Sequence, residues 1–428
     1  MGGLFSRPES INPNTIDLSH YTFHRVLGKG GYGTVTVVEH SYNDALDIES
    51  THGSTNQQLY VCKKIHKYKL VNNVHAYRST LLERSIGIQL TQQSIISSIP
   101  QYTVPLYHCL QTSDSLYLFY QLIHGGDLRY YIDNNICVSD ESQLIQYCAE
   151  LIVVLNQIHE LGLIYHDLKP DNIMIDSTGH IVLIDLGLCV HESDTCNILP
   201  SEYVRYRGTL GYMAPEILSG SSYTHCIDYY SLGVTLYELV HGSTILPNIT
   251  DIHSNNPIIF TDRMSNECHD FITRLLDVNP RTRLGANSID ELKFHVWFKN
   301  IDWCIVEQKQ LSVHYIPSTD TANCDYTYDL EDQLLGDVEL EQHTTNITDE
   351  QQLMFSEWNY NLHVNQTLQQ YLIQYNQQLQ SNIYTKFCSY IAQLYTRCTQ
   401  SSYHHKHKSR LNSTDSTDNI LNVIVVNG

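Results

Sequence analysis

Hydrophobic and polar positions divide the chain into a β-rich first part and a helix-rich second part. Residues Tyr21–Val38 follow the pattern strand, glycine turn, strand, and β-rich runs recur at Tyr60–Ile65 and Leu116–Leu122. Helical periodicity appears around Thr80–Leu90 and, with apolar residues at i, i+3 and i+4, over residues 142–161, 228–240 and 267–276. A small mostly-β part before a larger mostly-α part predicts an α+β fold with two lobes and any active site between them.

Four segments break this pattern. Residues 1–20 hold two prolines and no periodicity and are interpreted as a leader, and polar residues 40–58 predict a loop between two strands. Predicted order weakens over residues 305–360, which are acidic and polar. Leu362–Tyr395 then shows helical apolar spacing, which predicts a long Gln-rich amphipathic helix against its own domain or a partner; Gln-rich disorder is the alternative. Residues 401–428 are expected to be disordered.

Composition narrows the class of protein. The chain has 428 residues, of which 42% are apolar and 17% charged, enough for a large core. Lys and Arg number 25 against 46 Asp and Glu, so the formal charge of −21 argues against a nucleic-acid partner and favours basic ones. Its longest apolar runs are too short to span a bilayer, the 12 cysteines show no Cys-x-x-Cys pair, and no secretory signal opens the chain. We therefore expect a soluble, cytoplasmic protein.

A glycine-rich turn lies between the first two predicted strands. Gly28-Lys-Gly30-Gly31-Tyr-Gly33 would let the backbone approach phosphates closely and offer N–H groups to anionic oxygens. The same spacing is a dinucleotide-binding fingerprint, but that version requires a helix after the last glycine. Here Thr34–Val38 has the pattern of a strand, which favours a phosphate-covering hairpin.

Lys63 on the next predicted strand could bind phosphates with its ammonium group. Lys64 competes for this role, but strand alternation puts Lys63 on one face with Val61. Glu83 follows 20 residues later on the predicted helix and is the candidate ion-pair partner of Lys63. A surface ion pair is the plainer alternative for such a pair.

The most informative segment places Asp167, Lys169 and Asn172 within six residues. An acid, a cation and an amide in this order suit a proton acceptor, a phosphate contact and a metal ligand. Asp185 ends an apolar run beside glycine, a position from which a carboxylate can hold a cation. Three further motifs follow in order: Gly211–Glu216, Asp228–Gly233 and Arg283–Gly285.

In this order and spacing the motifs resemble those of the eukaryotic protein kinases over residues 21–298. The resemblance implies that Asp167 accepts the proton of the substrate hydroxyl, that Lys169 steadies the transferred phosphoryl group, and that Asn172 and Asp185 hold Mg²⁺. It also implies a set of residues that bind ATP: Leu27, Gly28, Gly30, Gly31, Gly33, Val35, Lys63, Glu83, Gln121, Ile123 and Asp127.

The resemblance further implies supporting roles. Gln121–Ile123 would be the adenine hinge, and Tyr120 a bulky gatekeeper that narrows the pocket behind it. Glu216 and Arg283 would form a structural ion pair under the activation segment, and Asp228 would also be structural. The implied catalytic contribution is in-line positioning and charge neutralisation.

The AGC group of Ser/Thr kinases is the most similar subgroup. Leu116–Leu128 and His295–Phe298 resemble AGC motifs, Asp320–Tyr326 resembles the active-site tether, and Phe355–Tyr360 resembles the hydrophobic motif. Gly125–Tyr130, the tether and the Met-Gly-Gly start are most similar to the YANK branch. The implied domains are a leader (1–20), a kinase domain (21–298, lobes 21–123 and 124–298), a tail (299–360), a helix (361–400) and a disordered end (401–428).

Four departures from the family bear on regulation. His166 replaces the Arg that binds an activation-loop phosphate, and Arg205 stands where AGC kinases carry the phosphorylated Thr. Asn359 stands at the phosphorylated position of the hydrophobic motif. These changes predict that loop phosphorylation is not the switch. Leu186 replaces Phe and keeps apolar packing. Because no phosphate or metal contact is lost, an active enzyme is favoured over a catalytically weak pseudokinase scaffold.

The resemblance also suggests a substrate class. Lys169 and Thr209 fit the Ser/Thr pattern, while Asp127, Asp171 and Glu238 match acidic positions that AGC kinases turn toward Arg or Lys of the substrate. These carboxylates could instead only solvate the helical lobe, or Asp127 contact only the ribose. Phosphorylation of a lipid or small molecule is disfavoured because residues 208–216 resemble a peptide-positioning segment.

The start of the chain, Met1–Ser6, matches the pattern for N-myristoylation on Gly2. One acyl chain anchors a protein only marginally, and Lys406, Lys408 and Arg410 would be a weak second signal. We therefore expect reversible association with membranes, and a helix-mediated partner through residues 362–395. These expectations describe an ATP- and Mg²⁺-dependent Ser/Thr protein kinase.

Overall fold

The computed structural model describes residues 17–41, 57–97, 99–134, 140–195, 208–242, 260, 264–318 and 347–362. All contacts given below lie within residues 1–362, which form one compact unit. Gly2, most of the predicted 40–58 loop, the tether-like segment and nearly all of the predicted Gln-rich helix lie outside the described residues. In the described part of the chain, no helix combines the length and hydrophobicity needed to cross a membrane.

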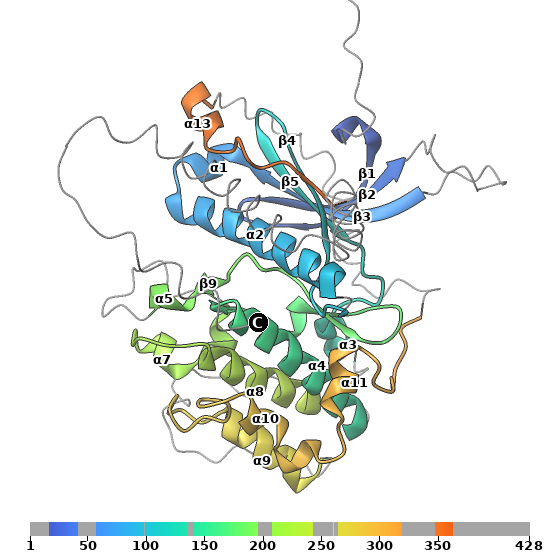
Figure 1. Ribbon diagram of the computed structural model, residues 1–428, viewed down its shortest axis with the longest axis vertical. Coiled ribbons are helices and arrows are strands. Elements are labelled where there is room, and N and C mark those ends of the chain that lie inside the picture. Colours follow the sequence, from blue (N-terminus) through green and yellow to red (C-terminus); the bar gives the residue numbers. More distant parts are fainter. Residues whose placement is uncertain are drawn as a thin grey trace, which may run out of the picture. The chain divides into compact units, whose positions relative to one another are not determined.

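The first lobe is built on a six-stranded antiparallel sheet with the order β1-β2-β3-β5-β4-β10 (Figure 1). Its strands are β1 (Tyr21–Lys29), β2 (Gly33–Ser41), β3 (Gln57–His66), β4 (Leu106–Gln111), β5 (Ser115–Gln121) and β10 (Tyr360–Asn361). β2 pairs with β3 up to His40–Gln58 and Ser41–Gln57. The prediction of a loop over 40–58 is therefore wrong at both ends, because the ladder continues into polar residues.

Helices α1 (Lys67–Val71) and α2 (Val74–Ser97) follow β3, and Figure 1 shows α2 running along the sheet. Ile86 and Leu90 of α2 are buried, and the Thr91 hydroxyl accepts a hydrogen bond of 3.0 Å from the Leu106 N–H of β4. A short 3₁₀ turn, Leu18–His20, precedes β1 and is capped by Asp17, so the last residues of the predicted leader are ordered.

The second lobe is mostly helical. Its helices are α3 (Leu128–Asp133), α4 (Glu141–Glu160), α5 (Glu192–Thr195), α7 (Pro215–Leu218), α8 (Cys226–His241), α9 (Asn266–Leu275), α10 (Asp290–Lys293) and α11 (Trp303–Glu307). Short strands β6 (Leu163–Ile164) with β9 (Val190–His191), and β7 (Ile173–Ile175) with β8 (Ile181–Leu183), carry the central loops. Almost all of α8 is buried, as expected for a helix surrounded by others. The predicted bilobal α+β fold is confirmed.

The predicted weakening of order beyond residue 305 is wrong for the described part of that segment. The Tyr102 hydroxyl donates a 2.6 Å hydrogen bond to the Val306 carbonyl, and Lys309 forms a 2.8 Å ion pair with Asp176. Residues 347–362 then return to the first lobe through α13 (Asp349–Leu353) and β10. The polar composition of this segment gave no sign of its order, because contacts from a few side chains suffice to hold it.

Two aromatic side chains anchor residues 347–362 to the first lobe. Phe355 and Trp358 are each 1% exposed and pack in the core cluster formed with α2, β4 and β5. Arg84 of α2 donates to the carbonyl oxygens of Trp358 (2.7 Å) and Glu357 (2.8 Å). The hydrophobic-motif-like segment is therefore bound to the helix that carries Glu83.

Lys67 supports the same segment from α1. Its buried ammonium donates to Gln111 (2.9 Å), to the Thr112 carbonyl (2.7 Å) and to Gln352 (2.7 Å), so all three protons are used on neutral oxygens. Burial lowers the pKa of Lys67. The Lys67 ammonium therefore joins the tail segment to the first lobe through neutral oxygen atoms.

Candidate active site

The glycine-rich hairpin joins β1 and β2. Backbone hydrogen bonds run in both directions between Gly30 and Gly33, at 2.8 and 3.3 Å, and Lys69 of α1 donates to the Gly31 carbonyl at 2.9 Å. A Cβ at Gly33 would lie 1.7 Å from the Lys64 carbonyl, so only glycine fits there. Leu27 is 40% exposed and Val35 lies opposite Lys63 in the ladder. The hairpin therefore lies next to the strand that carries Lys63.

The structure brings Lys63, Glu83 and Asp185 together. The Lys63 ammonium lies 2.7 Å from Glu83 Oε1 and 3.1 Å from Asp185 Oδ1. The Glu83 side chain is 4% exposed, whereas that of Asp185 is 47% exposed. Burial raises the pKa of Glu83, and the charge of Lys63 opposes this effect. The Lys63 ammonium thus bridges the buried carboxylate of Glu83 in α2 and the accessible carboxylate of Asp185, which follows β8.

Asp185 is held with a positive φ of 54°, a conformation that ordinary side chains rarely adopt. Its Oδ1 also accepts a 3.2 Å hydrogen bond from the Gly187 N–H. The nearby charge of Lys63 lowers the pKa of Asp185 and keeps it ionised. Its Oδ2 receives no hydrogen bond from the described residues, so this oxygen is available to a cation.

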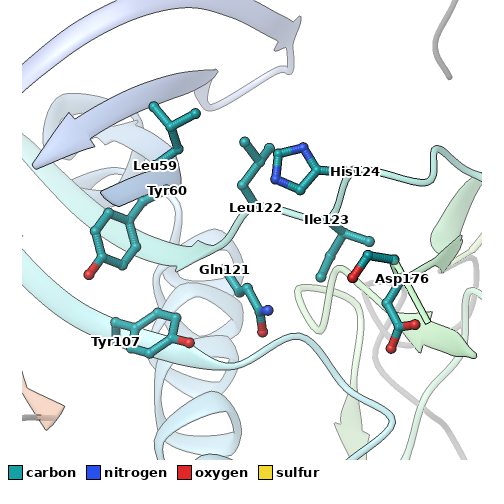
Figure 2. A pocket seen from close by; sticks show the side chains of 9 residues that line it. Leu59, Tyr60, Tyr107, Gln121, Leu122, Ile123, His124 and Asp176 are labelled. Carbon is teal, nitrogen blue, oxygen red and sulfur yellow. The ribbon is translucent and has the colours of Figure 1, made fainter. Parts of the chain in front are cut away.

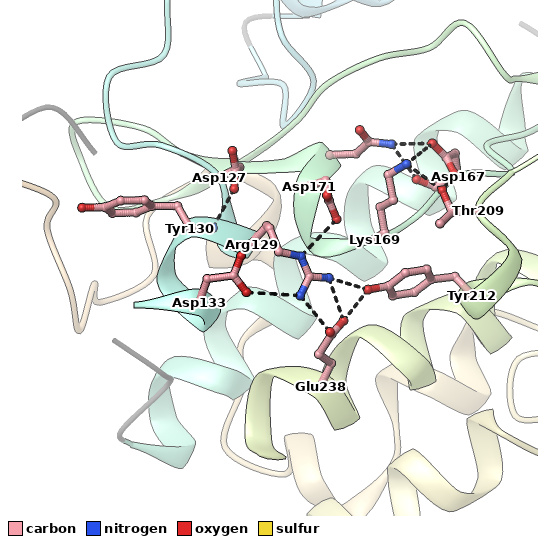
Figure 3. Close-up of polar contacts among 11 residues, drawn as sticks. Asp127, Arg129, Tyr130, Asp133, Asp167, Lys169, Asp171, Thr209, Tyr212 and Glu238 are labelled. Carbon is pink, nitrogen blue, oxygen red and sulfur yellow. Dashed lines mark hydrogen bonds and ion pairs between the residues drawn. The ribbon is translucent and has the colours of Figure 1, made fainter. Parts of the chain in front are cut away.

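Asp167, Lys169 and Thr209 form a second polar cluster (Figure 3), which Asn172 joins through a hydrogen bond to Asp167. The Asp167 carboxylate lies 2.9 Å from the Lys169 ammonium and accepts hydrogen bonds from Thr209 (2.8 Å) and Asn172 (2.9 Å). Lys169 also donates to the Thr209 hydroxyl at 2.6 Å. Asn172 uses its Nδ2 for both of its bonds to Asp167, which leaves its amide oxygen for another ligand.

Asp228 of α8 anchors the loop that carries Asp167. Its carboxylate accepts backbone N–H groups of Tyr165 and His166, each at 2.8 Å, and lies 2.8 Å from His159 Nε2. The bond to His166 holds that residue at a positive φ of 77° immediately before Asp167. Burial raises the pKa of Asp228, but the bonds and charge of His159 and the N–H of His166 outweigh it and leave the pKa below its ordinary value.

This arrangement predicts a stability effect that depends on pH. Because the folded-state pKa of Asp228 is depressed, its contribution is complete above the ordinary value of 3.8 and is lost as the pH falls through the folded value. We expect Asp228→Asn to reduce the free energy of unfolding by about 2–3 kcal/mol at pH 7. Urea denaturation of both proteins between pH 7 and 3 should show this difference shrinking at the acid end. A difference that stays constant with pH would contradict it.

Glu216 and Arg283 form a bidentate ion pair at 2.6 and 3.0 Å, and the Arg283 side chain is fully buried. Arg283 also donates to the Cys226 carbonyl (2.9 Å) and lies 5.1 Å over the Tyr230 ring. Arg283 therefore links Glu216 of α7 to Cys226, the first residue of α8.

The acidic residues predicted to receive basic substrates have partners of their own. Glu238 binds the Arg129 guanidinium at 2.8 and 3.1 Å and accepts the Tyr212 hydroxyl (Figure 3). Asp171, 48% exposed, lies 3.5 Å from the same Arg129. Asp127 caps α3 by accepting the N–H of Tyr130 at 2.8 Å. Glu238 is thus already neutralised, whereas Asp171 keeps an accessible carboxylate.

The hinge-like residues Gln121–Ile123 follow β5. A pocket of about 360 Å³ borders them and is lined by Leu59, Tyr60, Tyr107, Gln121, Leu122, Ile123, His124, Asp176 and Ser177 (Figure 2). Tyr60 occupies the face of β3 opposite to Lys63, since neighbouring strand residues alternate. None of the lining residues belongs to the two polar clusters around Lys63 and Asp167, so this pocket is not the site of the phosphate chemistry.

The positions at which the chain departs from the family are only partly described. His166 is 4% exposed and its Nε2 lies 2.9 Å from the Tyr223 hydroxyl, and Leu186 is 2% exposed in the core. Asn359 is exposed beside the buried Trp358. Arg205 lies outside the described residues.

Two functional contacts were not predicted from the sequence. The first is the bond from Arg129 to Glu238, one of the acidic residues predicted to bind basic substrates. The second is the hydrogen bond of 3.1 Å that the Tyr120 hydroxyl donates to Glu83. A cation among predicted anionic positions was the only sequence signal for Arg129. No local pattern indicates the Tyr120 bond, because its two residues come from β5 and α2.

Comparison with known proteins places these clusters in context. The family model described as protein kinase domain matches residues 21–298. The chain is 31% identical over 323 residues to a probable serine/threonine-protein kinase of Dictyostelium discoideum, covering 73% of this chain and 65% of the relative. It is 31% identical over 375 residues to serine/threonine-protein kinase gad8 of Schizosaccharomyces pombe (83% and 58%), and 32% over 326 residues to human rhodopsin kinase (72% and 52%). The chain thus spans between half and two thirds of the length of these relatives.

Proposed function

The chain belongs to the protein kinase family, in its AGC group, and we propose that it transfers the γ-phosphate of ATP to Ser and Thr hydroxyls of protein substrates. The observation that supports the proposal is the pair of polar clusters around Lys63 and Asp167, which brings together the side chains to which the motifs assign phosphate and metal contacts. The alternative of a catalytically weak pseudokinase scaffold finds no support in these residues. Membership of the YANK branch remains a prediction.

The residues present fit a magnesium ion. The free Oδ2 of Asp185 and the amide oxygen of Asn172 are hard oxygen ligands of the kind that Mg²⁺ prefers. When held by these oxygens, Mg²⁺ would supply positive charge that neutralises the phosphates of ATP. Lys63, held by Glu83, would contact the α- and β-phosphates beneath the glycine hairpin.

The cluster around Asp167 would act on the protein substrate that accepts the phosphate. Asp167 accepts the proton of the substrate hydroxyl, while Lys169, 2.9 Å away, stabilises charge on the transferred phosphoryl group. The Thr209 hydroxyl connects both side chains and fixes their separation. Because little covalent chemistry is asked of the protein, the rate depends on how well these groups are positioned.

We further propose that the substrates carry Arg or Lys near the acceptor. The support is the accessible carboxylate of Asp171, together with Asp127 and the overall charge of −21. The contribution of Glu238 would be smaller, since Arg129 already neutralises it.

We also propose that loop phosphorylation does not switch the enzyme on. His166 is a weak phosphate ligand and is buried against Tyr223, and the tail segment docks through neutral oxygens at Lys67. Reversible membrane association of a cytoplasmic enzyme through a myristoylated Gly2, and a partner bound by residues 362–395, remain proposals that rest on the sequence pattern.

One experiment tests the activity, substrate class and regulation together. Full-length protein is treated with phosphatase and then incubated with ATP, Mg²⁺ and a peptide library in which Ser, Thr or Tyr acceptors are flanked by Arg, Lys or Ala. We expect transfer to Ser and Thr, faster with basic flanks, and comparable before and after phosphatase treatment. Transfer should vanish when Mg²⁺ is chelated.

Each part of the proposed function would be contradicted by a different result of this experiment. Protein that binds ATP but phosphorylates no peptide would reject the kinase proposal in favour of a scaffold. Transfer to Tyr alone would reject the Ser/Thr class. Equal rates for basic and Ala flanks would reject the substrate preference, and loss of nearly all activity after phosphatase treatment would reject phosphate-independent activation.

A further inference from the structure

Tyr120 reaches from β5 to the buried end of the Lys63–Glu83 ion pair. Its hydroxyl donates to Glu83 Oε1 at 3.1 Å, and the Lys63 ammonium donates to the same oxygen at 2.7 Å. The Tyr120 residue is 9% exposed and its ring packs in the core cluster with Leu106 and Leu118. One carboxylate oxygen therefore receives two donors from two different strands.

The chemistry of this contact fixes its direction. Burial raises the pKa of Tyr120 well above its ordinary value, so the phenol keeps its proton and is the donor. The Glu83 side chain is only 4% exposed, so its carboxylate has little access to water. A buried carboxylate is stable only when its oxygens are hydrogen-bonded. Tyr120 supplies a second hydrogen bond to the Glu83 Oε1 atom that Lys63 also contacts.

The contact also ties separate elements together. Glu83 belongs to α2, whereas Tyr120 is the last residue before Gln121 at the end of β5 and pairs with Val61 two residues from Lys63. The bond fixes α2 against the strand that leads into the hinge. Without it, Lys63 would be the only hydrogen-bond partner of the Glu83 carboxylate among the described residues, and Lys63 must also contact phosphates.

We propose that Tyr120 is a positioning residue for ATP, which acts through Glu83 to hold the Lys63 ammonium at the phosphates. This proposal deepens the proposed kinase function and rests on it. If Tyr120 only filled space behind the nucleotide, its ring would be required but its hydroxyl would not.

Tyr120→Phe separates the two roles because it keeps the ring and removes only the hydroxyl. We expect kcat/KM for ATP to fall about tenfold, since a hydrogen bond to a charged group is lost. The KM for the peptide should stay unchanged, because the Asp167 cluster is not touched. Tyr117→Phe, the same change on the neighbouring part of β5, is the matched control and should match wild type.

A double-mutant cycle shows whether Tyr120 acts through Glu83. Dissociation constants for ATP with Mg²⁺ are measured by calorimetry for wild type, Tyr120→Phe, Glu83→Ala and the double variant. Once Glu83 is absent, adding Tyr120→Phe should weaken ATP binding less than twofold. Equal weakening in both backgrounds would overturn the proposal, as would an unchanged Tyr120→Phe enzyme. Thermal denaturation verifies that all four proteins are folded.

The outcome is distinguishable from a failure of the proposed function. Wild-type protein that transfers no phosphate would reject the kinase function itself, and the positioning role with it. Active wild type with a Tyr120→Phe variant of equal kcat/KM for ATP would reject only the role of the hydroxyl.

Discussion

Asp167→Asn is expected to reduce kcat for peptide phosphorylation by about 10²–10⁴-fold, the usual contribution of a general acid or base. The amide cannot take the proton of the substrate hydroxyl. Its NH₂ group would also face the Lys169 ammonium or the Nδ2 of Asn172, both of which now donate to the carboxylate. The loss should therefore combine the missing base with a disturbed cluster.

Affinity for ATP should change little in this variant, because Lys63, Glu83 and Asp185 form a separate cluster. Asp290→Asn on α10 is a suitable control, since its carboxylate is exposed and lies outside both clusters. Single-turnover kinetics with a Ser peptide and calorimetry with ATP measure the two quantities. An Asp167→Asn enzyme with more than a tenth of the wild-type kcat would exclude Asp167 as the base.

Trp358→Ala is expected to release the tail segment from the first lobe and lower both stability and activity. Removing a fully buried aromatic side chain costs about 3–5 kcal/mol, and the variant would also lose the Arg84 contact to the ring at 5.7 Å. Arg84 follows Glu83 in α2, so a loosened helix should hold Lys63 less well. We expect a lower melting temperature and a higher KM for ATP.

Leu353→Ala is the matched control, because Leu353 belongs to the same segment and is 71% exposed. Trp358→Phe should retain most of the stability, since the Trp358 Nε1 has no hydrogen-bond partner among the described residues and the ring can be replaced. Calorimetric melting and steady-state kinetics on the four proteins test the ranking. If Trp358→Ala behaved like Leu353→Ala, the docked tail would not support the helix.

The bilobal fold could be predicted from the sequence because its signals are local. Alternation along the strand around Lys63 indicated which lysine faces the site, and α4 begins and ends within one residue of the predicted helix at 142–161. The motif containing Asp167, Lys169 and Asn172 is compact, so one loop carries all three of its members.

The features missed by sequence reasoning depend on distant partners. β4 was not predicted, because its residues are buried on both faces and show no period of two. The ion pair between Arg129 and Glu238 joins α3 to α8, and no spacing along the chain predicts this pair. The ordered tail was missed because two aromatic anchors carry the packing of an otherwise polar segment.

The docked tail also determines how the first lobe meets other molecules. Phe355 and Trp358 belong to the same chain as the core cluster that they complete, so the effective concentration of this aromatic pair at its binding site is on the order of millimolar. A free peptide with a similar aromatic pair at micromolar concentration would occupy little of it. Because Tyr360–Asn361 also pairs with β4, the backbone edge that such a peptide could extend is already taken. The tail segment therefore protects this binding site from other peptides, and a partner can bind there only after the protein's own tail has dissociated.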